Sequence, residues 1–221
     1  MTTYKPNLAE DLFRIHKVIT RGLEVGLSKG SEYLETGVTL PKELLGFSTY
    51  IHCFHEVLSS HHQGEDAIAF PAFRKVLPHA PYDRLAVDHR GVEHQLTKLP
   101  QALQDLSENK SKLGLAIIID TLSQISEVWY PHIQVEEENF SEDKLNTVLT
   151  FEEQKSIDEA ASKHSQEHSG PPYWVLPFVL YNLDQEERIK FSVNFPPAIV
   201  NELIPISWKD QWAPMKPFLL E

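Results

Sequence analysis

Apolar residues recur every three or four positions along most of the chain, which is the spacing of one face of an α-helix. The first predicted helix begins at Leu8 and ends at the stop signals Gly26 and Gly30. The same spacing predicts further helices over about residues 41–73, 83–109, 112–139 and 151–163, of which the last is the most polar. These elements predict an all-α fold.

Three prolines fall inside the predicted helices. Proline lacks a backbone N–H and its ring clashes with the preceding turn, so it bends or ends a helix. We expect Pro71 to kink or end the second helix and Pro100 to bend the third. Pro131 should remove one backbone hydrogen bond from the fourth helix and kink it.

The composition changes at Ser169. Eight of the 15 prolines and three of the four tryptophans lie beyond it. So many prolines do not suit a long amphipathic helix or a central strand, and so many aromatic residues are not typical of a flexible linker. We therefore expect a helical domain over residues 1–168. Residues 169–221 should be an extension that packs on it, with a short helix near 177–182 followed by irregular chain.

Charge and cysteine content narrow the possible functions. The 221 residues carry a formal net charge of −12, which argues against a nucleic-acid or anionic-membrane partner. A single cysteine, Cys53, excludes an internal disulfide and a cysteine-based metal site. We see no signal peptide and no apolar run long enough for a bilayer, so we predict a soluble, cytoplasmic protein. Eleven histidines beside many carboxylates point instead to metal binding.

Three histidines are each followed four residues later by a glutamate, and residues at this spacing share one face of a helix. A fourth histidine, His16, lies among the apolar residues of the first predicted helix. Imidazole and carboxylate groups that converge from several helices form the metal sites of helical bundles. The sequence therefore predicts one or two metals held by His16 and by the pairs His61 with Glu65, His89 with Glu93, and His132 with Glu136.

The other histidines are expected to lie outside this site. His62 is turned about 100° around the helix from His61, which favours a place at the rim of the bundle or behind the ligands. His52 lies nine residues before His61 and should face elsewhere, although Glu56 follows it at the same spacing.

The chain resembles the hemerythrin-like cation-binding family, and in particular its fungal type with a C-terminal extension. The resemblance implies an up-down four-helix bundle that holds two iron ions. Six candidates match its ligand positions directly, namely His16, His61, Glu65, His89, His132 and Glu136. The similar segments are residues 16–23, HHQGEDAIAFP (61–71), DHRGVEHQL (88–96), HIQVEEENF (132–140), LPFVLYNLD (176–184) and residues 195–208.

Glu93 departs from the family pattern, which usually has a second histidine four residues after the position of His89. Either Glu93 replaces that imidazole, or His94 reaches in through a local distortion. We favour Glu93, because Leu96 then keeps its register. Pro131, directly before His132, is a second departure.

An additional carboxylate at the metals would donate charge and favour oxygen activation over reversible binding. We therefore predict a non-haem diiron protein that binds or activates dioxygen. The alternative is a diiron oxygenase or oxidase acting on a small, secondary-metabolite-like molecule, and the choice between carrier and enzyme stays open. Iron storage and a metal-free interaction domain are further alternatives, and zinc and manganese are alternative ions. We identify no catalytic residue apart from the metal site.

Overall fold

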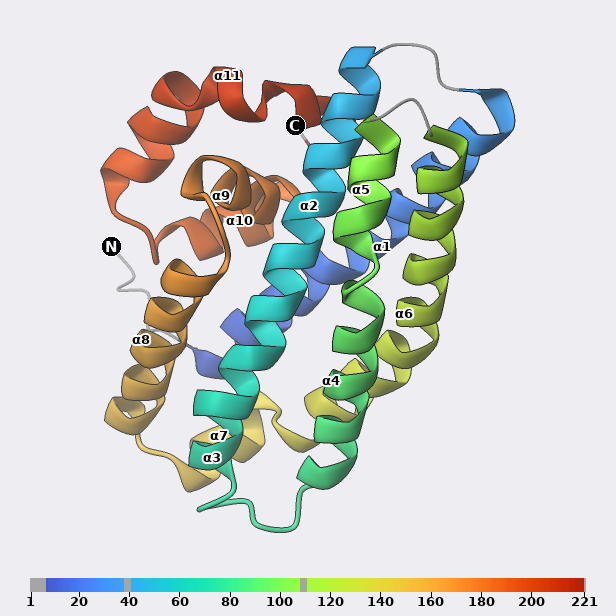
Figure 1. Ribbon diagram of the computed structural model, residues 1–221. Helices are drawn as coiled ribbons and strands as arrows, with labels where there is room; N and C mark the ends of the chain where they lie inside the picture. The colour runs from blue at the N-terminus through green and yellow to red at the C-terminus, as the bar shows by residue number, and fades with distance from the viewer. Residues whose placement is uncertain (1–6, 38–40, 108–110, 221) are drawn as a thin grey trace.

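Four helical rods form the centre of the molecule in the computed structural model, which describes residues 7–37, 41–107 and 111–220. The rods are α1 (Leu8–Thr36), α2 (Pro41–Gly64), α4 (Tyr82–Leu96) continued by α5 (Leu99–Ser107), and α6 (Ser111–Asn139). Each rod packs on the next and α6 returns to α1, with connections at alternating ends (Figure 1). The described residues form helices and no strand, so the predicted all-α bundle is confirmed.

The first helix is longer than predicted, because Gly26 and Gly30 do not end it. It continues to Gly37, which adopts the left-handed conformation with φ 71°. A Cβ atom on Gly26 would lie 2.6 Å from the side chain of Leu122, and one on Gly30 would lie 3.0 Å from that of Ile119. The two glycines therefore allow α1 to pack closely against α6, and glycine at these positions serves packing rather than termination.

The end of α2 is irregular. The helix passes into η1, one π-helical turn over Glu65–Ala69, and then into the short α3 (Phe70–Phe73). Pro71 lies in the first turn of α3 and has no N–H for the carbonyl four residues before it. A wider turn before the proline accommodates this loss. The irregularity therefore precedes Pro71, and the helix ends just after it.

The other two prolines act differently from one another. The predicted helix over 83–109 is divided into α4 and α5 two residues before Pro100, and its predicted end near residue 109 lies outside the described residues. Pro131, by contrast, lies within α6, which runs on to its end at Asn139. No helix in the described part of the chain, α6 included, is both long enough and apolar enough to cross a membrane.

The chain after α6 is helical almost throughout. It begins with α7 (Glu142–Val148), which the sequence analysis missed, and α8 (Phe151–His168). The start of α8 is fixed by a capping box in which Thr150 and Glu153 exchange hydrogen bonds. In Figure 1, α8 lies along the lower part of α2, and it also contacts α1 and η1.

The C-terminal residues form helices, so the prediction of irregular chain is wrong. The elements are α9 (Pro172–Tyr181), α10 (Gln185–Ser192), the π-helix η2 (Ile199–Ser207), α11 (Lys209–Trp212) and the 3-10 helix η3 (Ala213–Phe218). Pro172 and Pro214 stand in the first turns of their helices, where a missing N–H costs nothing. The division of the chain at residue 168 stays a prediction.

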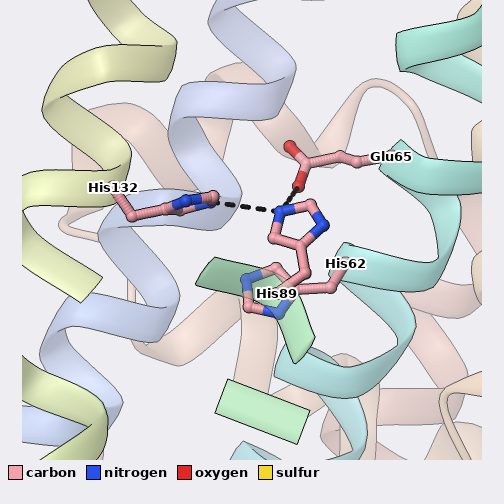
Figure 2. Close-up of side chains that lie close together, drawn as sticks. All are labelled: His62, Glu65, His89 and His132. Carbon is pink, nitrogen blue, oxygen red and sulfur yellow. Dashed lines mark hydrogen bonds and ion pairs between the residues drawn. The ribbon is translucent and has the colours of Figure 1, made fainter. Parts of the chain in front are cut away.

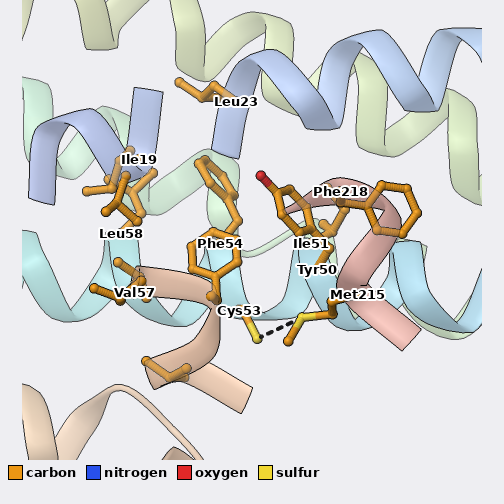
Figure 3. Packing of buried hydrophobic residues seen from close by; sticks show 14 of the residues in the cluster. Ile19, Leu23, Tyr50, Ile51, Cys53, Phe54, Val57, Leu58, Met215 and Phe218 are labelled. Carbon is orange, nitrogen blue, oxygen red and sulfur yellow. Dashed lines mark hydrogen bonds between the residues drawn. The ribbon is translucent and has the colours of Figure 1, made fainter. Parts of the chain in front are cut away.

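One hydrophobic core joins the bundle to these C-terminal helices (Figure 3). Tyr50 of α2 packs against Phe178 and Phe218, and the Cys53 thiol lies 3.8 Å from the Met215 sulfur. Burial raises the pKa of the Cys53 thiol, so it stays protonated. A side chain on Gly46 would collide with the Pro214 carbonyl, so η3 lies directly on α2.

Candidate metal centre

Histidines and glutamates from all four rods meet inside the bundle. His16 comes from α1, Glu65 begins η1, and His89 comes from α4. Each of the side chains concerned is buried, with at most 5% of its surface exposed. The full set is His16, His61, His62, Glu65, His89, His132 and Glu136. The structure thus brings together six of the seven predicted ligands and adds His62.

The set divides into two groups of four that share Glu65. Within each group, one ligand atom of every residue lies within 4.8 Å of those of the others. The first group is His62, Glu65, His89 and His132, in which His89 stands between Glu65 and His132 (Figure 2). The second group is His16, His61, Glu65 and Glu136. Two adjoining groups are the arrangement expected of a site for two metal ions.

Glu65 connects the two groups through its two oxygens. Its Oε1 lies 3.4 Å from His61 Nε2 and 4.0 Å from His16 Nε2. Its Oε2 lies 3.4 Å from His89 Nε2 on the other side. A carboxylate that faces two sets of imidazoles is suited to bridge two metal ions.

Glu136 faces both sets in the same way. Its Oε2 lies 3.3 Å from His16 Nε2. Its Oε1 lies 3.3 Å from His132 Nε2 and 3.8 Å from His89 Nε2. The centre therefore contains two carboxylates in bridging positions, each surrounded by imidazoles.

Several buried polar atoms of this cluster have no hydrogen-bond partner among the described residues. They include His16 Nε2, His61 Nε2, both ring nitrogens of His62, Glu65 Oε2 and both oxygens of Glu136. Buried polar groups in proteins are nearly always satisfied, so a concentration of unsatisfied ones needs an explanation. Metal ions would satisfy these atoms, and imidazole with carboxylate suits iron, zinc and manganese. The residues present therefore fit a metal centre.

Carboxylates lie behind three of the imidazole rings of the cluster, and two of these rings are hydrogen-bonded to them. The Nδ1 atoms of His16 and His89 lie 3.0 Å from Glu137 and Asp66 respectively. His132 Nδ1 lies 3.5 Å from Asp88. A carboxylate on one ring nitrogen leaves the other free for a metal and makes it a better donor. These three rings therefore present Nε2 to the interior.

Burial and neighbouring charge shift the proton affinities in opposite directions. Burial lowers the pKa of His61 and His62 well below the usual value, so these rings are neutral. Burial also opposes the charging of His16 and His89, but nearby carboxylates have the larger effect. They raise the pKa of His16 well above its usual value and that of His89 to about 9. Metal binding requires unprotonated ligands. Binding should therefore displace protons from His16 and His89.

The pKa values of the two carboxylates, Glu65 and Glu136, are also shifted in opposite directions. Burial and the charge of Glu136 raise the pKa of Glu65. Burial acts in the same direction on Glu136, but the nearby imidazoles of His132, His16 and His89 lower its pKa well below the usual range. Glu136 is therefore the carboxylate that stays ionised in the metal-free cluster.

The structure does not bring Glu93 into either group. The Glu93 carboxylate lies partly buried between α4 and α2, where it accepts a hydrogen bond of 3.3 Å from the Ser59 hydroxyl. His94, the alternative, is exposed. His89 is thus the one residue of α4 in the two groups.

His62 lies in the buried cluster, whereas the sequence favours a place for it at the rim of the bundle or behind the ligands. His61 belongs to the group with His16, whereas His62 belongs to the group with His89 and His132. Adjacent residues of one helix can both reach a site when that site has two parts on neighbouring faces. The sequence signal for His62 is the adjacent pair His61 and His62, three to four residues before Glu65. Helix spacing alone selects only His61 of this pair as a ligand.

A cavity of about 560 Å³ adjoins the cluster on the side of α8. His61 and Glu65 form part of its wall, together with residues of α1, α8, α9 and η2. The cluster therefore has beside it a cavity that is much larger than a dioxygen molecule.

A comparison with models of protein families gave a match to the part of the chain that carries this cluster. The family model for the hemerythrin HHE cation binding domain matches residues 7–143. All seven clustered side chains lie within that span. No curated protein and no solved structure gave a match to the chain.

Proposed function

The chain belongs to the hemerythrin HHE cation-binding domain family, and on this premise we propose that it is a non-haem diiron protein that binds or activates dioxygen. The observation that carries the proposal is the pair of four-residue groups that share Glu65. His16 and His61 would hold one iron. The other iron would be held by three histidines, namely His62, His89 and His132. Glu65 and Glu136 would lie between the two ions.

The protein's contribution is to hold these ligands together in the buried interior of the bundle. When bound, two irons supply redox chemistry and coordination positions for dioxygen. Trp129 packs edge-on against His16 and is fixed by a hydrogen bond of 2.9 Å to Thr20. Phe70 stacks on His89 with ring centroids 5.5 Å apart. These aromatic rings exclude water and limit the rotation of the imidazoles.

The observed residues change the argument about carrier and enzyme. The sequence suggested four imidazoles and three carboxylates, with Glu93 favouring oxygen activation. The clustered residues are five imidazoles and two carboxylates, and Glu93 is not among them. The balance of ligands therefore no longer favours activation.

An oxygenase or oxidase acting on a small molecule is the second candidate function. The observation that favours it is the cavity, because its wall includes His61 and Glu65. A carrier needs access for dioxygen alone, whereas an enzyme of this type needs a space for an organic substrate beside its metals.

Anaerobic reconstitution with ferrous iron followed by exposure to air tests the proposal. We expect about two irons per chain and a visible absorption band that depends on oxygen. Reversal of the band under vacuum without net oxygen consumption would indicate a carrier, and continued oxygen uptake with a reductant would indicate an enzyme. Protein that binds no iron, or only zinc or manganese, would contradict the proposal.

A further inference from the structure

The cavity beside the cluster has walls from two parts of the chain. Its inner wall is formed by α1, the end of α2 and η1, which lie within the span that matches the family. Its outer wall is formed by α8, α9, the segment after α10, and η2, which all follow that span. At about 560 Å³, the cavity has the size of sites that bind small organic molecules.

Apolar side chains make up most of the lining. Representative residues are Leu12, Ile15, Val57, Val179, Phe195 and Trp208. They come from both walls, so a bound molecule would be enclosed between the bundle and the C-terminal helices. Such a surface favours the burial of a hydrocarbon or aromatic body, at roughly 25 cal/mol for each Å² removed from water.

Asp158, on the outer wall, is a charged group in this mostly apolar lining. It lies on α8, partly buried, and its carboxylate makes no hydrogen bond or ion pair with any residue that the structure describes. Burial and the nearby charge of Asp11 raise the pKa of Asp158 to about 6, so the group is ionised at neutral pH. The neighbouring carboxylate of Asp11, unlike that of Asp158, has a partner, because Arg14 donates a hydrogen bond of 2.6 Å to it.

Two other polar residues of the lining, Ser60 and Ser169, satisfy each other, because their hydroxyl groups lie 2.9 Å apart and are hydrogen-bonded. A ligand with a positive charge would give Asp158 a partner, which it does not have among the described residues. The net charge of −12 favours cationic ligands and disfavours anionic ones.

We propose that this cavity binds a mainly apolar small molecule that carries a protonated amine. The amine pairs with Asp158, and the apolar body lies along the walls towards His61 and Glu65. Binding itself requires no metal. A role of the bound amine as a substrate at the metals, by contrast, rests on the proposed function.

Calorimetric titration of the full-length protein, freed of metal with a chelator, tests the proposal. Phenylbutylamine, phenylbutanol and phenylbutyrate are suitable probes, because they share one apolar body and differ in the polar end. A charge-assisted hydrogen bond contributes about 1.5–3 kcal/mol, so we expect the amine to bind at least about tenfold more tightly than the alcohol. The carboxylate should not bind measurably.

Variants on α8 connect the selectivity to Asp158. Asp158→Asn should abolish the preference for the amine and leave the affinity for the alcohol unchanged. Glu159→Gln is the matched control, because it removes the same charge from the adjacent, exposed residue and should leave the preference intact. Ala161→Phe places a large side chain in the cavity and should weaken all binding.

Three results would overturn the proposal. They are no binding of any probe, equal binding of amine and alcohol, and an unchanged preference in Asp158→Asn. If Ala161→Phe does not fold, the comparison of Asp158→Asn with Glu159→Gln still decides. Failure here leaves the iron content and the oxygen-dependent absorption untouched, so it is distinguishable from failure of the diiron proposal.

Discussion

The imidazole rings of His62 and His89 lie stacked, with their centroids 4.1 Å apart and their planes at 15°. The two residues come from different helices, α2 and α4. The family pattern places a second imidazole four residues after the position of His89, where this chain has Glu93. His62 supplies an imidazole beside His89 from the neighbouring helix.

Replacing His62 by alanine should therefore impair metal binding. We expect His62→Ala to lose one of two irons or to bind iron at least about tenfold more weakly, since changes behind the ligands alone already cost that much. Iron per chain after desalting measures the effect. His94→Ala is the control and should retain full iron, because His94 is exposed. Full iron content in His62→Ala would refute the assignment.

Glu93 should be dispensable for iron binding. Its carboxylate is bonded to Ser59 outside both groups, and glutamine can keep that hydrogen bond. We expect Glu93→Gln to retain the iron content and the visible spectrum of the parent protein. If the variant loses iron as His62→Ala is expected to, Glu93 is a ligand after all.

Removal of the metal should lower the melting temperature, by an amount that depends on pH. A ligand at a thousand times its dissociation constant stabilises the fold by about 4 kcal/mol. The raised pKa of His89 stabilises the metal-free fold below the ordinary value of 6.5, and this contribution is lost as the pH rises through about 9. Metal binding meanwhile strengthens as protons leave His89.

The difference in melting temperature between loaded and metal-free protein should therefore grow between about pH 6.5 and pH 9. Differential scanning calorimetry of both forms measures it. A difference that shrinks over this range would be inconsistent with a protonated His89 in the metal-free protein.

Gly46→Ala should destabilise the protein by displacing η3 from α2. The added Cβ would collide with the Pro214 carbonyl, and overpacking of this kind costs about 1–3 kcal/mol. Gly91→Ala is the matched control, since Gly91 lies exposed in α4 with nothing within 4 Å of an added Cβ. It should gain up to about 1 kcal/mol from helix propensity. Urea denaturation of both variants makes the comparison, and equal stability would argue against the close contact.

Asp158→Asn should stabilise the protein at neutral pH but not in acid. The pKa of Asp158 is raised to about 6 in the fold from 3.8, so the fold favours its protonated form. The destabilisation of the fold by the ionised Asp158 carboxylate grows as the pH rises from 3.8 to about 6 and then stays constant. We expect a gain of about 1 kcal/mol above that range, allowing for solvent screening, and none below it. Denaturation at both ends of the range checks the sign.

The sequence predicted the helices of the bundle and six of the seven clustered residues because both follow from regular spacing. Heptad-like apolar positions define the buried face, and histidines on that face must point inward. His62 escaped this reasoning because its place depends on how α2 sits between its neighbours. His61 and His62 both reach the cluster because α2 lies between other helices, so that His61 meets His16 of α1 and His62 meets His89 of α4.

The errors at glycine and proline have a common origin. Gly26 and Gly30 read as helix ends, but they are contact points between α1 and α6. The prolines after residue 169 predict breaks in regular structure, but two of them, Pro172 and Pro214, stand in the first turns of short helices. The local preference of a residue type is compatible with more than one role, and tertiary packing decides which one it takes. The residues that line the cavity are distant from one another in sequence, so spacing along the chain does not identify them.

Asn182 shows how closely the last helices are joined to the first ones. Its amide oxygen accepts hydrogen bonds from the Tyr50 hydroxyl at 2.7 Å and from Arg21 at 2.9 Å, and Arg21 also bonds the Phe218 carbonyl. A chain shortened to the family span would leave these groups and one side of α2 in water. We therefore expect the two halves of the chain to unfold together, so that amide hydrogens of both halves exchange through the same global opening.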